Sequence, residues 1–293
     1  MVVVDLRLAL MSRSPSSSPR SIDTGTTFLL GQIAEGVATL TLNRPERMNA
    51  LHPEIFDAFG AVLPVLALDE EVGAIVVTGA GRAFCAGGDV GVQSARAEKA
   101  AAGERIGFEA SVADLRRRQN MVSAQLYEHP KVTIAALGGA AAGAGMSIAL
   151  ACDLRVASQS AFLLSAFAKV GFSGDFGGSW FLTQLVGSAK ARELYLGNER
   201  VGAEEALRLG LVSKVWPNEG FAEAVQRYAV DFASGPLVAY RYMKENLNRA
   251  ATHDLRTCLD GEAVAMTAAG RTEDHREAAK AFTEKRAPAF KGR

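Results

Sequence analysis

Asp175 is an isolated carboxylate in a segment of glycines and aromatic residues that reads VGFSGDFGGSW from residue 170 to residue 180. The glycines allow the backbone to approach a ligand closely, and Phe172, Phe176 and Trp180 can form apolar walls. A carboxylate in such surroundings has a raised pKa, which suits it to proton transfer near neutral pH. A structural role is the alternative, because Asp often caps a helix and a helix is predicted to begin near Gly177. The segment alone leaves both roles open.

Two other stretches could do chemistry through backbone N–H groups. One runs from Gly81 to Asp89, and the other, residues 138–146, is a run of glycine and alanine that leads into a predicted helix. Unpaired N–H groups and the helix dipole make a helix start attractive to anions. The second stretch lacks the Lys-Ser/Thr pair of a P-loop, and Gly143-x-Gly145 alone is a weak dinucleotide signal. An oxyanion is therefore the ligand that these stretches favour.

Strands and helices must position these residues. Continuous apolar runs at residues 74–79 and 131–137 are typical of parallel strands covered on both faces. Each N–H-rich stretch follows one of these runs, at the carboxyl end where open α/β sheets bind ligands. The alternation of strands with helices indicates the α/β class. The other predicted strands are 28–32, 37–42, 154–157 and 161–164, and the predicted helices are 53–68, 147–151, 179–185, 188–196, 203–209 and 221–233.

Residues 93–128 carry dense charge with interspersed apolar side chains. This pattern predicts amphipathic helices, with the triplet Arg116-Arg117-Arg118 on a solvated face. A mobile substrate lid within this segment remains an open alternative.

The chain is expected to divide into three regions. Residues 1–27 are predicted to be a flexible tail, because residues 12–27 are rich in Ser, Pro and Arg. Residues 28–233 form the α/β core, and residues 234–293 a helical region that docks on its own core or on a neighbouring subunit. The start of the chain lacks the order of a signal peptide, and translation from Met11 is an alternative.

The composition excludes several classes of function. The 32 basic residues balance the 32 acidic ones, so no general attraction to nucleic acid or to an anionic membrane is expected. The 3 cysteines show no CxxC spacing and the 4 histidines lie far apart, so neither a disulfide framework nor a metal site is expected. No apolar run reaches the ~20 residues of a membrane span. We therefore expect a soluble protein of a reducing compartment.

The ordered motifs of the chain resemble the crotonase, or enoyl-CoA hydratase/isomerase, superfamily over about residues 28–292. The resemblance implies a crotonase (ClpP-like) spiral of ββα units with a helical C-terminal region, in a cytoplasmic enzyme that assembles as a homotrimer or hexamer. The motifs that carry it are Leu42-Asn43-Arg44-Pro45, Asn49-Ala50-Leu51, Gly81-Arg82-Ala83-Phe84-Cys85-Ala86-Gly87-Gly88-Asp89, Ala142-Gly143-Ala144-Gly145, Ala149-Leu150-Ala151-Cys152-Asp153, Gly210-Leu211-Val212 and Ala281-Phe282-Thr283-Glu284-Lys285-Arg286.

The resemblance also implies the substrate and its contacts. The substrate would be an acyl-CoA thioester in fatty-acid or related degradation, with CoA as part of the substrate and no separate cofactor. Its carbonyl oxygen would accept hydrogen bonds from the N–H groups of Gly88 and Ala144, where such donors stabilise a developing enolate. The implied CoA contacts are Arg47, Arg82, Ala86, Phe282 and Lys285, with the last two reaching CoA from the C-terminal helix, within the chain or across a subunit interface.

The sequence departs from the family's hydratases at two positions. The glutamates that those hydratases use to activate water align with Ser147 and Phe167, which cannot move a proton at neutral pH. Asp175 lies where a subgroup that includes phenylacetate-pathway epoxide isomerases and enoyl-CoA isomerases carries an acidic residue. A single carboxylate is enough for double-bond isomerisation, and hydration with help from Ser173 stays open. A different kind of function is also open, in which the protein binds acyl-CoA or RNA without catalysis. The retained Asp175 argues against a protein without catalysis, and the zero net charge argues against RNA binding.

Overall fold

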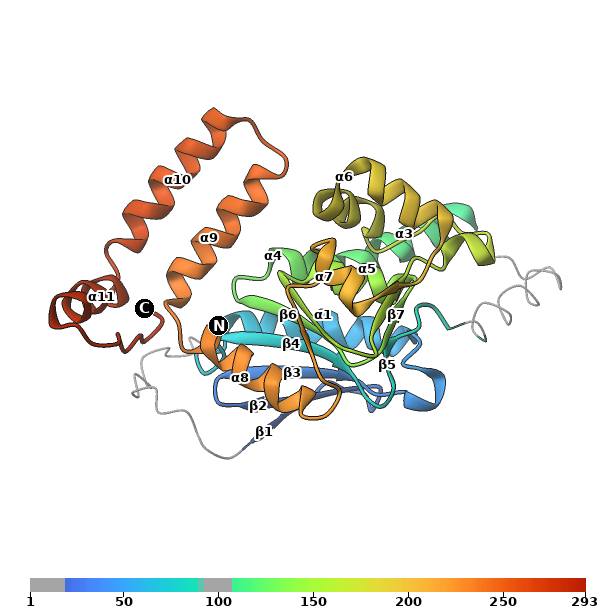
Figure 1. The fold of residues 1–293 in the computed structure, drawn as a ribbon, viewed down its shortest axis with the longest axis horizontal. Coiled ribbons are helices and arrows are strands. Elements are labelled where there is room, and N and C mark those ends of the chain that lie inside the picture. The colour runs from blue at the N-terminus through green and yellow to red at the C-terminus, as the bar shows by residue number, and fades with distance from the viewer. Residues whose placement is uncertain (1–18, 90, 92–106) are drawn as a thin grey trace, which may run out of the picture.

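The computed structural model describes residues 19–89, 91 and 107–293, and it contains two sheets (Figure 1). The larger sheet has 7 strands in the order β1-β2-β3-β4-β6-β8-β11. The β2–β3 hairpin is antiparallel, as predicted, and β3, β4, β6, β8 and β11 are parallel. The strands are β1 (Arg20–Ile22), β2 (Leu29–Ala34), β3 (Val37–Leu42), β4 (Ala74–Gly79), β6 (Val132–Leu137), β8 (Leu154–Ser158) and β11 (Lys214–Trp216).

The parallel strands are apolar throughout because both of their faces are covered. On one face, Val37, Val76 and Ile134 pack against α8 (Phe221–Ala233). On the other face, alternate residues such as Leu40 and Val77 join the main core with α1, α5 and the second sheet. This arrangement confirms the interpretation of the continuous apolar runs as buried parallel strands.

The second sheet has 4 short strands in the order β10-β9-β7-β5. Two of these strands lie inside the stretches predicted to be loops, and that part of the prediction is wrong. Three-residue strands of small side chains show no periodicity, and their pairing depends on close backbone approach. A Cβ atom on Gly139 would lie 2.8 Å from the carbonyl carbon of Arg82. The strands are β5 (Ala83–Cys85), β7 (Ala140–Ala142), β9 (Phe162–Leu164) and β10 (Val201–Gly202).

The helices of the core agree closely with the sequence pattern. From residue 108 the charged segment forms α3, a short π-helix (Asn120–Ala124) and α4, whereas the part of the segment before residue 107, for which a lid was also considered, lies outside the described residues. Residues 179–197 were expected to form two helices, and the chain breaks helical geometry at Gly187, where φ is 74°. The helices are η1 (Pro45–Arg47), α1 (Pro53–Leu68), α3 (Phe108–Gln119), α4 (Gln125–Glu128), α5 (Ala144–Ala151), η3 (Phe167–Val170), α6 (Gly178–Gly197) and α7 (Ala203–Arg208).

The last part of the chain is helical and extends from one end of the molecule (Figure 1). It contains α9 (Leu237–Ala250), α10 (Leu255–Ala269) and α11 (Glu273–Glu284). Several large apolar side chains are exposed on these helices, among them Leu255, Val264 and Met266. None of the helices in the described ranges is long and apolar enough to cross a membrane.

The start of the described chain differs from the expected tail. Residues 20–22 of the tail predicted over residues 1–27 form β1, which pairs antiparallel with β2. Thr24 is buried, and its hydroxyl donates a hydrogen bond to the carbonyl of Leu29 at 2.5 Å. The sheet therefore begins before residue 28.

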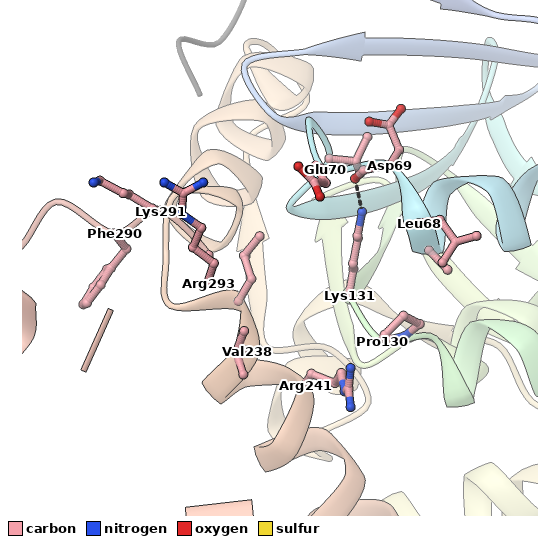
Figure 2. Close-up of a pocket in the computed structure, with 14 residues that line it drawn as sticks. Leu68, Asp69, Glu70, Pro130, Lys131, Val238, Arg241, Phe290, Lys291 and Arg293 are labelled. Carbon is pink, nitrogen blue, oxygen red and sulfur yellow. Dashed lines mark hydrogen bonds between the residues drawn. The ribbon is translucent and has the colours of Figure 1, made fainter. Parts of the chain in front are cut away.

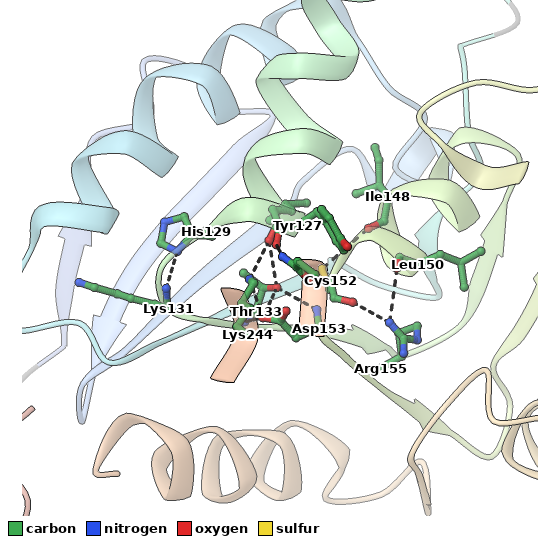
Figure 3. Close-up of polar contacts among 12 residues, drawn as sticks. Tyr127, His129, Lys131, Thr133, Ile148, Leu150, Cys152, Asp153, Arg155 and Lys244 are labelled. Atoms are coloured by element: carbon green, nitrogen blue, oxygen red, sulfur yellow. Dashed lines mark hydrogen bonds and ion pairs between the residues drawn. The ribbon is translucent and has the colours of Figure 1, made fainter. Parts of the chain in front are cut away.

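A buried polar network attaches α9 to the core (Figure 3). Asp153 Oδ2 accepts hydrogen bonds from the Thr133 N–H at 2.8 Å and from the Thr133 hydroxyl at 3.0 Å. The same oxygen pairs with Lys244 Nζ at 2.8 Å, and Lys244 also donates to the carbonyl of Leu126. Asp153 Oδ2 is therefore bound by groups from both β6 and α9.

Candidate active site

The N–H groups of Gly88 and Ala144 lie on two adjacent loops. The loops follow β5 and β7, which pair in parallel with Ala83 opposite Ala140. A Cβ atom on Gly87 would lie 3.4 Å from the Ala144 nitrogen and 2.8 Å from the carbonyl oxygen of Ala142. The backbone of Gly87 thus packs directly against the start of α5. A side chain there would displace one loop from the other.

Both N–H groups are available to a ligand. Ala144 is the first residue of α5, so its N–H has no partner within the helix. Gly143 precedes it with φ 53° and ψ −127°, a conformation that favours glycine. Gly88 is exposed, and the backbone hydrogen bonds of the described residues use neither its N–H nor that of Ala144. Two unpaired N–H groups on neighbouring segments are groups that could donate to an oxyanion.

Asn49 and Arg44 hold the first of these loops in place. Asn49 is buried, with Nδ2 donating to the carbonyls of Ala80 at 2.9 Å and Ala83 at 2.7 Å. Its Oδ1 accepts from the Arg44 N–H at 2.9 Å. Arg44 in turn pairs with Asp89 at 2.9 Å, next to Gly88, and both side chains are largely buried. Sequence reasoning used Asn49 and Arg44 only as family markers and missed these roles.

Asp175 does not cap α6. The helix begins at Gly178, its N-cap is Gly177, and no side chain caps it. The Gly178 N–H instead bonds to the backbone carbonyl of Asp175 at 3.1 Å. The capping interpretation of the Asp175 side chain is therefore wrong.

One oxygen of the Asp175 carboxyl is buried and has no hydrogen-bond partner among the described residues. Oδ1 is inaccessible to solvent and accepts no hydrogen bond from the residues that the structure describes. Burial raises the pKa of Asp175 to about 6, as an apolar environment does for a carboxylate. Such a group can change its protonation state near neutral pH.

The aromatic residues near Asp175 differ in how far they are exposed to solvent. Phe176 is buried, stacks on Phe56 with ring centroids 5.4 Å apart, and donates its N–H to Gln119 Oε1 at 2.9 Å. Trp180 is half-buried and packs edge-on against Tyr127. Phe172 is 55% exposed, so the prediction that it forms a wall of the site is wrong. The turn presents its side chain to solvent instead.

The Asp175 segment lies against the first turn of α5. Cβ of Ser147 would lie 3.2 Å from a Cβ atom on Gly178, and Ser147 itself is fully buried. A Cβ atom on Gly143 would lie 3.7 Å from the ring of Phe167, which is also buried. Ser147 and Phe167 therefore border the turn that carries the Ala144 N–H, and neither supplies a carboxylate.

Tyr195 is a residue of this region that the sequence did not single out. Its hydroxyl is buried without a hydrogen-bond partner among the described residues. Burial raises the pKa of Tyr195 to about 12, with a further contribution from the charge of Asp175. Tyr195 lies 20 residues after Asp175, near the end of α6, so only the fold brings the two together.

The predicted CoA contacts fall into two groups. Arg47 and Arg82 are exposed. They lie on neighbouring turns, since a Cβ atom on Gly81 would lie 3.1 Å from Cβ of Pro45. Ala86 is half-buried between them and Gly88, and its N–H donates to the carbonyl of Met48 at 3.0 Å. These residues share the edge that carries the first N–H loop.

Phe282 and Lys285 are not brought to this edge within one chain. Both lie at the end of α11, and Figure 1 places α11 at the opposite end of the molecule from β5 and β7. Phe282 is 87% exposed there.

A separate cavity of about 410 Å³ lies near the C-terminus (Figure 2). Its walls come from the end of α1, the start of β6, α9 and the C-terminal segment, and Lys131 Nζ donates to the carbonyl of Asp69 within it. The cavity borders the amino ends of β4 and β6, whereas Gly88 and Ala144 follow the carboxyl ends of strands. It is distinct from the candidate active site.

In the described part of the chain, no group of three or more His, Cys, Asp or Glu side chains could hold a metal ion.

Known proteins resemble this chain in sequence and in fold. A family model described as enoyl-CoA hydratase/isomerase matches residues 32–293. The 1,2-epoxyphenylacetyl-CoA isomerase of Escherichia coli is 36% identical, over 91% of this chain and 99% of that protein. The short-chain-enoyl-CoA hydratase of Clostridium acetobutylicum is 34% identical, over 85% of this chain and 92% of that protein. The crystal structure of a putative enoyl-CoA hydratase from Streptomyces coelicolor superposes with a TM-score of 0.83 at 34% identity, over 99% of this chain and 100% of that one.

Proposed function

The chain belongs to the enoyl-CoA hydratase/isomerase family, and we propose that it shifts the double bond of an enoyl-CoA thioester with Asp175 as its single acid/base. The observation that carries this proposal is the state of the Asp175 carboxyl, which is buried, unpaired at Oδ1 and not used as a helix cap. A carboxylate left in that state costs free energy. A role in proton transfer would explain why the Asp175 carboxylate is left without a partner, whereas a role in holding the fold together would not.

The reaction needs one base and one oxyanion site. Asp175 removes a proton from C2 of a 3-enoyl-CoA, and the negative charge moves to the thioester oxygen. The N–H groups of Gly88 and Ala144 stabilise that dienolate, and such donors contribute about 3–4 kcal/mol each. Asp175 then returns its proton to C4, which gives the 2-enoyl-CoA. Atoms and charge balance without water or a second carboxylate.

The pKa of Asp175 suits both steps. With a pKa raised to about 6, the group is mainly ionised at pH 7 and is a stronger base than an exposed carboxylate. Its conjugate acid is still strong enough to protonate a dienolate.

Isomerisation is preferred over hydration because of what surrounds Asp175. Hydration requires a positioned water and, in the family's hydratases, two glutamates, whose places are taken here by Ser147 and Phe167. The relatives include proteins named as isomerase and as hydratase, so similarity alone does not choose between the two reactions.

Binding of CoA is proposed to use two chains. Arg47, Arg82 and Ala86 of one chain would contact the nucleotide and pantetheine, with CoA as part of the substrate. Phe282 and Lys285 would come from α11 of a neighbouring subunit, since they lie far from this edge in their own chain (Figure 1). A homotrimer or hexamer would place them there and cover the apolar side chains exposed on α10 and α11.

Incubation with 3-enoyl-CoA and 2-enoyl-CoA thioesters in deuterated water tests the proposal. We expect interconversion of the two isomers, with deuterium at C2 or C4 and little 3-hydroxyacyl-CoA. Rapid formation of 3-hydroxyacyl-CoA from the 2-enoyl thioester, with no shifted double bond, would show a hydratase instead. A protein that binds the thioesters without converting either would be the non-catalytic alternative.

A further inference from the structure

We propose that Gln119 is a positioning residue for Asp175: its side-chain amide holds the turn that carries the carboxylate, and turnover depends on that hold. The inference rests on the function proposed above. It gives a role in the reaction to a side chain that belongs to none of the motifs behind the family resemblance.

The turn around Asp175 has a backbone that ordinary residues rarely adopt. Gly174 and Gly177 have φ values of 105° and 77°, and Phe176, which follows Asp175, has a φ of 51°. This left-handed region disfavours residues other than glycine, and bulky ones most of all. Such a conformation persists only where the surrounding structure holds it, and it is frequent at functional sites. The contacts that hold Phe176 therefore also fix the backbone at Asp175.

Two helices hold Phe176 from outside the turn. Gln119 Oε1, at the end of α3, accepts a hydrogen bond from the Phe176 N–H at 2.9 Å. Among the described residues, no other side chain is hydrogen-bonded to the backbone of residues 173–177. Phe56 of α1 stacks on the Phe176 ring, with the centroids 5.4 Å apart. The stacking holds the ring, whereas Gln119 holds the amide that is joined directly to the carbonyl carbon of Asp175.

Gln119 reaches the turn from a firmly packed part of the chain. The helix α3 ends at Gln119, and the residues after it form the π-helix Asn120–Ala124, a wide turn of a kind that is frequent at functional sites. Val122 of this π-helix is fully buried. A Cβ atom on Gly60 of α1 would lie 3.1 Å from Cγ of Met121. The chain is thus packed on α1 immediately after Gln119, which fixes the position of its side chain.

A neutral amide suits this position. Gln119 accepts a hydrogen bond without bringing a charge next to Asp175, and burial is what raises the pKa of that carboxyl. A cation at position 119 would lower the pKa of Asp175 and make it a weaker base. The charge of the neighbouring Arg118 is directed elsewhere, because its guanidinium pairs with Asp114 at 2.5 Å and lies 5.2 Å from the centroid of the Phe56 ring. Gln119 therefore supports the turn and leaves the ionisation of Asp175 to its surroundings.

The variant Gln119→Met tests the inference, because methionine has a similar length and lacks the amide acceptor. A displacement of about 1 Å can cost about 10²-fold in rate, so we expect kcat for isomerisation at pH 8 to fall by about 10–100-fold. KM should change by less than about threefold, since the CoA contacts lie elsewhere. Gln119→Glu keeps an acceptor and should retain kcat within about fivefold of the wild type. All rates are compared per folded molecule, so that a loss of folded protein does not count as a loss of turnover.

Asn120→Ala is the matched control. Asn120 is the next residue, it is exposed, and its amide donates to the carbonyl of Arg116 within the same helix. Its replacement should leave kcat unchanged. Turnover of Gln119→Met at the wild-type rate overturns the inference, and so does an equal loss of kcat in Gln119→Met and Gln119→Glu.

Hydrogen exchange separates this inference from the proposed function, because it needs no substrate. The exchange of peptides that cover residues 172–180 is followed by mass spectrometry in the wild type and the three variants. Faster exchange of the Phe176 N–H in Gln119→Met, but not in Gln119→Glu or Asn120→Ala, supports the hold on the turn. Equal exchange in all four proteins overturns it, whether or not the protein is an isomerase. A wild type that shifts no double bond overturns the proposed function and leaves the exchange result standing.

Discussion

Asp153 and Asp175 are both shielded carboxylates, and the fold treats them in opposite ways. Asp153 Oδ2 receives two hydrogen bonds from Thr133 and an ion pair from Lys244 at 2.8 Å (Figure 3). Asp175 Oδ1 is buried and receives none from the described residues. The difference comes from the neighbouring elements. Asp153 faces a strand and a helix with polar side chains, whereas Asp175 lies among glycines and aromatic rings.

This comparison separates structural carboxylates from those available for chemistry. The ion pair of Asp153 with Lys244 holds α9 on the core, and a ligand of this carboxylate would have to displace that ion pair and the two hydrogen bonds from Thr133. Asp175 is held by its backbone, through the Gly178 N–H and the contact of Phe176 with Gln119, while its side chain stays available. Burial alone does not distinguish the two carboxylates, whereas their hydrogen bonds do.

The largest expected effect is on turnover in Asp175→Asn. Loss of the acid/base should lower kcat for isomerisation by about 10²–10⁴-fold, the usual contribution of a positioned proton-transfer group. Binding of a CoA thioester, measured by isothermal titration calorimetry, should change little because CoA contacts lie elsewhere. A variant with normal turnover would remove Asp175 from the mechanism.

The matched change at the other carboxylate should act on stability. Asp153→Asn leaves the buried Lys244 ammonium without its anionic partner, which should lower the free energy of unfolding by about 3–5 kcal/mol. Urea denaturation at pH 7.5 measures this loss. The turnover of Asp153→Asn per folded molecule should stay near that of the wild type. An unchanged midpoint would mean that the network does not hold α9.

The smallest expected effect has the opposite sign. The pKa of Asp175 is about 6 in the folded chain and about 3.8 without burial, so ionisation favours the unfolded state as the pH rises through this range. At pH 8 the penalty is complete and amounts to at most about 3 kcal/mol. Asp175→Asn should therefore be more stable than the wild type at pH 8, by an amount that shrinks toward pH 4. Thermal unfolding of both proteins across this pH range measures the difference in stability. A difference that did not depend on pH would contradict the comparison.

The sequence predicted the strands that are buried on both faces and the helices whose apolar residues recur at a regular spacing. The strands β4 and β6 appear as continuous apolar runs because α8 and the main core cover their two faces. The helix α8 agrees with its predicted limits at both ends. The short strands β5 and β7 could not be predicted, because three small residues carry no pattern and their pairing is a long-range event.

The candidate site was only partly accessible to sequence reasoning. The glycine-rich pattern marked the two N–H-rich stretches, the family resemblance placed the donors at Gly88 and Ala144, and a lone carboxylate marked Asp175. Choosing between cap and acid/base required knowing that no side chain caps α6. Tyr195 and the exposed Phe172 depend on how α6 and the turn before it fold back, which local sequence does not specify.

Asn49 holds together the backbone that leads into the first N–H loop. Its amide joins three backbone segments, through the Arg44 N–H and the carbonyls of Ala80 and Ala83. The conformational entropy of the loop that carries Gly88 is thereby lost when the chain folds and not when a substrate arrives. A ligand that meets a fixed donor loses less freedom on binding. More of its interaction energy is then left to act on the reacting atoms.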